Sequence, residues 1–121
     1  MECWGNMPHE RDRLFKLIER TKAMGAFFIS GDVHFTELSI SKDEGPYPLY
    51  DLTSSGLNQS PGSNWYTSVN TYRLPGKMYP GRNFGLIQID WAGKNTTITL
   101  QGRKESGEVA HEEVVPLGQL R

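Results

Sequence analysis

Apolar side chains recur at helical spacing near the start of the chain. The stripe consists of Leu14, Phe15, Leu17, Ile18 and Met24. This spacing predicts an amphipathic helix, with Asn6 or Met7 as its cap and Pro8 in its first turn. Gly25 is a suitable residue to end it.

A continuous apolar run, "AFFIS" at residues 26–30, follows the predicted helix. Such a run is typical of a strand that is covered on both faces of a sheet. Residues 35–40, "FTELSI", fit either a short helix or a strand, and residues 49–55, "LYDLTSS", predict a second strand. A helix that leads into a buried strand indicates an α/β protein.

Residues 57–82 are polar and rich in Asn, Ser, Gly and Pro, which predicts a long loop of functional use or an insertion. Three β patterns follow: "NFGLIQIDW", "TTITLQGR" and "EVAHEEVVPL". The short connections "AGKN" and "KESG" have hairpin length, so these strands are expected to form an antiparallel meander with one face on a core.

The predicted elements do not complete a mixed sheet. A single helix and two inner strands cannot cover both of its faces, so the apolar run at 26–30 needs further neighbours. Residues 1–121 are therefore predicted to be a single, partial domain. Marginal solubility or oligomerisation is expected of the chain alone.

Composition narrows the choice of partners. With 36% hydrophobic and 22% charged residues, the 121-residue chain has the composition of one globular domain. Its net charge is −1 and it has no basic block, so nucleic acid and anionic membranes are not expected as main partners. Cys3 is the only cysteine, which excludes an intrachain disulfide and a cysteine-based zinc motif. No apolar run reaches the roughly 20 residues of a membrane span. The sequence does not indicate a cellular compartment.

Candidate chemistry lies at the end of the first predicted strand, where Asp32 and His34 follow Gly31. A carboxylate and an imidazole are common ligands of catalytic metals, and ligand sites in open α/β sheets form beyond the carboxyl ends of strands. The alternative is an ordinary turn aspartate beside a structural histidine. A catalytic site needs at least three protein ligands, and His9 and His111 are both expected on the surface.

Four stretches together resemble a known family. "CWGNMPHERDRLFKLI", "ISGDVHFTEL", "YPLYDLTSSGL" and "NFGLIQIDW" are similar to the C-terminal part of the PhoD-like alkaline phosphatases, within the metallophosphoesterase (calcineurin-like) superfamily. The similarity spans most of residues 2–91 in the same order. It implies the C-terminal part of a four-layer α/β/β/α sandwich, with one main helix, inner strands and a C-terminal meander.

The resemblance also implies an activity. Residues 31–34 match the family's Gly–Asp–x–His motif, so Asp32 and His34 are expected to bind a dinuclear metal centre that hydrolyses phosphoesters through a metal-activated water. Iron and calcium are the metals implied for the PhoD-like enzymes, with manganese or zinc possible. A carboxylate oxygen and an imidazole nitrogen are compatible with all of these metals and do not distinguish among them.

Further residues are candidates for roles around this site. Gly31 and Trp4, together with Glu2, are expected to line the site. Arg73 is a candidate for phosphate contact, because its planar group matches phosphate geometry, although a solvated loop arginine is equally consistent. Glu37 is either the acceptor for the free N–H of His34 or a solvent-facing residue.

The superfamily's earlier motifs do not occur before residue 26. The missing N-terminal part of the same domain is therefore expected to be a partner, Met1 to be an internal methionine or a truncated start, and the isolated chain to be inactive. Two alternatives stay open. One is a β-rich module that binds carbohydrate or protein through the loop aromatics Trp65, Tyr66, Tyr72 and Tyr79, and the other is a purely structural domain.

Overall fold

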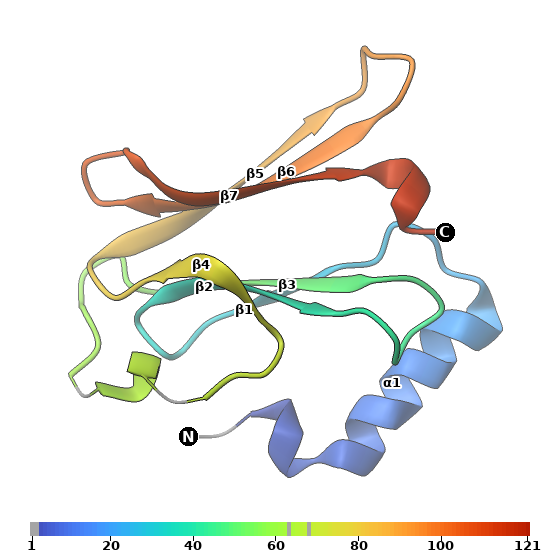
Figure 1. Cartoon of the computed structure of the whole chain (residues 1–121), viewed down its shortest axis with the longest axis horizontal. Coiled ribbons are helices and arrows are strands. Elements are labelled where there is room, and N and C mark those ends of the chain that lie inside the picture. The colour runs from blue at the N-terminus through green and yellow to red at the C-terminus, as the bar shows by residue number, and fades with distance from the viewer. Residues whose placement is uncertain (1–2, 63, 68) are drawn as a thin grey trace.

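The computed structural model describes residues 3–62, 64–67 and 69–121. Within these residues, one α-helix and two β-sheets form a mixed α+β arrangement, in which α1 and the second sheet lie on opposite sides of the first sheet (Figure 1). The helix is α1 (Pro8–Thr21), and the strands are β1 (Phe28–Ser30), β2 (Thr36–Ser41), β3 (Leu49–Ser54), β4 (Arg73–Tyr79), β5 (Asn83–Asp90), β6 (Thr97–Lys104) and β7 (Val109–Pro116). Short 3-10 turns lie at Trp4–Asn6, Asn64–Thr67 and Leu117–Gln119.

Helix α1 begins at Pro8, as predicted, and has Glu10 in its first turn. Its apolar side packs on the first sheet: Phe15 and Ile18 are buried, and the Phe15 ring stacks on Phe28 with centroids 6.1 Å apart. The helix ends earlier than Gly25, because Lys22 adopts the left-handed conformation and its N–H caps the last turn. Met24 therefore lies beyond the helix and is exposed rather than part of its apolar stripe.

The first sheet has the order β1-β3-β2-β4, with β1 parallel to β3 and the other pairs antiparallel. On the side that faces the second sheet, Leu38 of β2 lies directly opposite Leu52 of β3, and both are essentially inaccessible to solvent. Ile98 and Leu100 of β6 belong to the same core. Burial of this apolar area is the main force that holds the two sheets together.

The second sheet is the predicted antiparallel meander, in the order β5-β6-β7. Two predictions about the first sheet are wrong. The run at 26–30 is not a strand covered on both faces: β1 is short, lies at the edge of its sheet, and exposes 69% of Ile29. The region 57–82 is not a structureless loop, because β4 pairs with β2 there.

Strand β4 escapes sequence analysis for a physical reason. Its sequence, RLPGKMY, includes Pro75, and Gly76 has a φ of 70°. Proline and glycine normally interrupt a strand, and they are tolerated at a sheet edge, where a missing N–H does not break a ladder on both sides. β4 occupies that position in the first sheet.

His111 is buried between the sheets, at 5% exposure, so the prediction of a surface position is wrong. Its Nε2 lies 3.1 Å from Thr36 Oγ1 of β2, and Nδ1 has no hydrogen-bond partner among the described residues. Burial lowers the pKa of this imidazole; an interaction with the backbone of Thr36 opposes the change and the charge of Lys77 on β4 adds to it. Gly102 of β6 completes the contact, since a Cβ there would lie 2.3 Å from Nε2.

This burial predicts a pH-dependent stability. Below the ordinary imidazole pKa of 6.5, the unfolded chain takes up a proton that the folded protein resists, so the free energy of unfolding falls as the pH drops. Urea unfolding between about pH 7.5 and 5.5 should show this decline in the wild type, by about 1.4 kcal/mol for each unit of pKa difference. The decline should be smaller in His111→Gln, whose amide can keep the contact with Thr36. The exposed His9→Gln is the matched control, and parallel curves for wild type and His111→Gln would contradict the prediction.

Candidate functional site

Asp32 and His34 lie in the loop that leaves the carboxyl end of β1 and returns as β2. Both residues have positive φ angles, 71° for Asp32 and 62° for His34. Aspartate and histidine are among the non-glycine residues found most often in this region. The conformation nevertheless costs on the order of 1–3 kcal/mol per residue and persists only where the surroundings hold it. The loop is therefore under constraint.

The constraint on His34 comes from both of its peptide groups. Its N–H donates to Ser55 Oγ at 3.1 Å, and its carbonyl accepts from Asn83 Nδ2 at 3.1 Å. Ser55 follows β3 and Asn83 begins β5, so both sheets contribute to the conformation of this residue. The close approach explains Gly31 as well, since a Cβ there would lie 3.1 Å from the Cβ of Ser55.

Asn83 was not identified as a site residue from sequence, although it is 1% exposed and bonded to several segments. Its Nδ2 also donates to the Gly81 carbonyl at 2.8 Å, and its Oδ1 accepts from Ser54 Oγ at 2.9 Å and from Gly56 N at 3.4 Å. The available signal was an asparagine at the first position of an apolar strand pattern. Such a residue must satisfy its amide when buried.

The donor chemistry of the loop suits a metal ion. Asp32 is exposed and His34 is half-buried, so a carboxylate oxygen and an imidazole nitrogen are both available at the carboxyl end of β1. No group of three or more His, Cys, Asp or Glu residues that could hold a metal occurs in the described parts of the chain. His9 is exposed on α1 and His111 lies between the sheets. Asp32 and His34 alone are therefore fewer than the three protein ligands that a catalytic metal site needs.

A polar cluster adjoins the loop on the side of the first sheet away from the second sheet. Ser30 Oγ, one residue before Gly31, lies 2.9 Å from Asp51 Oδ1 and 2.7 Å from Thr53 Oγ1. Burial raises the pKa of Asp51; the hydrogen bond from Ser30 opposes this rise and the charge of Glu37 reinforces it. The cluster extends the hydrogen-bonded network from β1 to β3.

The structure places Glu37 and Arg73 together. Glu37 lies in β2 with 9% of its side chain exposed, so the solvent-facing interpretation is wrong. Its carboxylate accepts hydrogen bonds from Arg73 Nε and from Asn70 Nδ2. Among the described residues, no hydrogen bond joins Glu37 to His34. Arg73 lies in β4 and is mostly buried, so it is not a solvated loop arginine, and its charge is already paired with Glu37.

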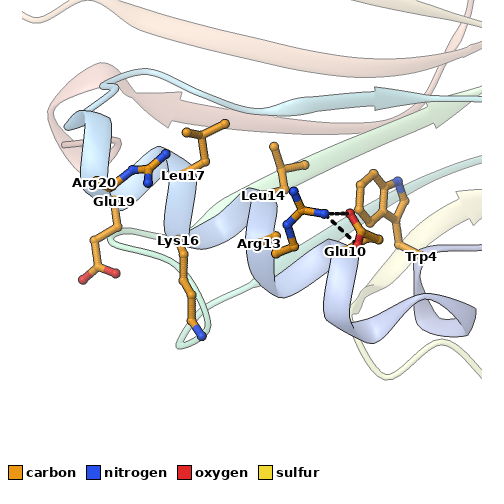
Figure 2. Close-up of a pocket in the computed structure, with 8 residues that line it drawn as sticks. All are labelled: Trp4, Glu10, Arg13, Leu14, Lys16, Leu17, Glu19 and Arg20. Carbon is orange, nitrogen blue, oxygen red and sulfur yellow. Dashed lines mark hydrogen bonds and ion pairs between the residues drawn. The ribbon is translucent and has the colours of Figure 1, made fainter.

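Trp4 lies in the 3-10 turn that precedes α1, where it lines a groove along that helix (Figure 2). The other lining residues are Glu10, Arg13, Leu14, Lys16, Leu17, Glu19 and Arg20. Arg13 and Glu10 form an ion pair at 2.7 Å beside the indole. Trp4 therefore lines a groove of α1 residues that does not include Asp32 or His34, whereas Gly31 directly precedes Asp32. Glu2 and Met1 lie outside the described residues.

Two of the aromatic residues predicted for a binding surface are engaged within the fold. The Tyr72 hydroxyl accepts from Arg11 at 3.1 Å and donates to Glu44 at 3.0 Å, while the Tyr79 ring has Lys104 Nζ 5.7 Å from its centroid. The side chains of Trp65 and Tyr66 lie outside the described part of the structure. Contacts within the fold therefore account for the positions of Tyr72 and Tyr79.

The described helices include none that is long and apolar enough to cross a membrane. Comparison with protein-family models, with curated proteins and with solved structures finds no match to this chain. The resemblance to the PhoD-like phosphatases therefore rests on the sequence motifs quoted above.

Proposed function

We propose that residues 1–121 are the C-terminal part of a PhoD-like, metal-dependent phosphatase or phosphodiesterase, and that Asp32 and His34 are two ligands of its dinuclear metal centre. One observation carries the proposal. Asp32 and His34, whose side chains are of metal-ligand type, stand two positions apart at the carboxyl end of a strand, both with a positive φ that costs free energy, and other segments hold the peptide groups of His34. Such strain is concentrated at functional sites.

Each residue has a defined part in this site. Asp32 offers an anionic oxygen, His34 offers a neutral imidazole nitrogen, and Gly31 lets the chain pass close to Ser55. Iron and calcium are the metals that the resemblance suggests, with manganese or zinc as alternatives. When bound, a metal pair supplies a hydroxide from coordinated water and positive charge for the phosphoryl oxygens. The remaining ligands are proposed to come from the N-terminal part of the same domain.

Titration with Mn²⁺, followed by NMR of the backbone amides, tests the proposal and detects weak binding. Amide signals of residues 31–35 should broaden at lower Mn²⁺ concentrations than signals elsewhere. Asp32→Asn and His34→Asn should both weaken this effect, because each removes a ligand while asparagine tolerates a positive φ. The exposed His9→Gln is the control and should behave as the wild type.

Two results would contradict the proposal. One is broadening that is no stronger at residues 31–35 than across the surface, or that survives both substitutions. The other is rapid hydrolysis of p-nitrophenyl phosphate or bis(p-nitrophenyl) phosphate by the purified 121-residue chain with either ligand residue replaced. The unmodified chain is expected to have little or no activity, since Asp32 and His34 form only part of a coordination shell.

A further inference from the structure

We infer that Asn83 is a positioning residue for the loop of Asp32 and His34: its side-chain amide holds the His34 peptide and thereby sets the position of the imidazole. The expected effect on metal binding rests on the proposed function. The structural claim, that Asn83 controls the conformation of the loop, can be tested without any metal. Asn83 belongs to β5 of the second sheet, whereas the loop belongs to the first.

The hydrogen bonds of Asn83 leave its amide a single orientation. An asparagine side chain has two N–H donors and an oxygen that can accept two bonds. Both donors are used, on the carbonyls of His34 and Gly81, and the oxygen accepts from Ser54 and Gly56. With 1% exposure, no water can replace these partners without opening the structure. A fully satisfied buried amide is a rigid support.

The bond from Asn83 acts on the peptide that follows His34. The peptide that precedes His34 is fixed by Ser55 Oγ, so both dihedral angles of this residue are restrained. Without the bond from Asn83, the His34 carbonyl can rotate and the backbone can relax from φ 62° toward the negative values that non-glycine residues prefer. The imidazole would then leave the position that its backbone sets.

The chemistry of the contact requires an amide at this position. A carboxylate of the same size keeps the acceptor for Ser54 and Gly56 but faces the carbonyls of His34 and Gly81 with oxygen instead of N–H. Asn83→Asp therefore removes the two donated bonds with the smallest change in shape. Groups that orient a metal ligand change metal affinity by about 10–100-fold when they are removed.

The experiment compares Asn83→Asp with a matched control, Gln101→Ala. Gln101 is also buried, at 5% exposure, and bonds to Glu112 and Arg103 within the second sheet. In the metal-free proteins, the amide resonances of residues 31–35 should move in Asn83→Asp and stay in place in Gln101→Ala. Mn²⁺ affinity, measured by broadening at these amides, should fall by about 10–100-fold in Asn83→Asp and be unchanged in the control.

Wild-type loop resonances in folded Asn83→Asp would overturn the inference. If that variant does not fold, exchange of the Asn83 side-chain amide protons in the wild type decides instead. Because coupling between two equilibria is reciprocal, Zn²⁺ binding should slow this exchange, and unchanged exchange at saturation would overturn the inference. If the wild type binds no metal at the loop, the proposed function fails. The metal-free resonances of Asn83→Asp, or of the milder Ser54→Ala if needed, then still decide whether Asn83 positions the loop.

Discussion

Replacement of Leu38 by alanine is expected to lower the free energy of unfolding by about 3 kcal/mol. Leu38 has no exposed surface and lies opposite Leu52, on the side of the first sheet that packs against β6. The substitution removes apolar contacts and leaves a cavity, because neighbouring strands joined by hydrogen bonds cannot move in to fill it. Urea unfolding followed by circular dichroism measures the change.

Ile29→Ala is the matched control for this experiment. It removes a similar amount of apolar side chain from the same sheet, but Ile29 is 69% exposed on β1. A change within about 0.5 kcal/mol is expected, as for most surface substitutions. A loss in Ile29→Ala as large as the one expected for Leu38→Ala would show that Ile29 is covered in solution, whereas a small loss in both variants would show that the core position assigned to Leu38 is wrong.

The comparison of sequence with structure shows which patterns carry information. The meander at residues 83–117 was predictable, because its strands alternate regularly and short turns connect them. Strand β4 was not, since Pro75 and Gly76 disguise it, and only its pairing with β2 makes it a strand. The prediction for residues 26–30 failed because their composition is that of a buried strand. Their actual burial depends on neighbouring segments, which the local sequence does not specify.

The candidate site divides in the same way. Asp32 and His34 were visible as a local pattern, because both follow closely after Gly31 at a strand end. Asn83 and Ser55, which hold His34, are separated from it by 49 and 21 positions, so only the packing of the strands reveals them. Glu37 and Arg73 pair across 36 positions and were assigned separate roles for the same reason.

Gly56→Ala is expected to have an effect as large as that of Leu38→Ala, by steric conflict at the site. A Cβ on Gly56 would lie 2.2 Å from Asn83 Nδ2 and 2.5 Å from the His34 carbonyl oxygen. One of these groups must move, and the bond between them must break. Overpacking costs about 1–3 kcal/mol, and an unsatisfied buried polar group adds about 1–3 kcal/mol. A loss of about 3–4 kcal/mol is therefore expected in urea unfolding.

Gly62→Ala provides the comparison, because a Cβ there meets nothing within 4 Å. It should leave stability within about 0.5 kcal/mol of the wild type. In any Gly56→Ala protein that still folds, the amide resonances of residues 31–35 should move together with those of Gly81 and Asn83, since the same hydrogen bonds join them. Large destabilisation with unchanged loop resonances would mean that Gly56 supports the core alone. Small destabilisation would mean that Asn83 and His34 have room to separate, and that the loop is less constrained than its two positive φ angles indicate.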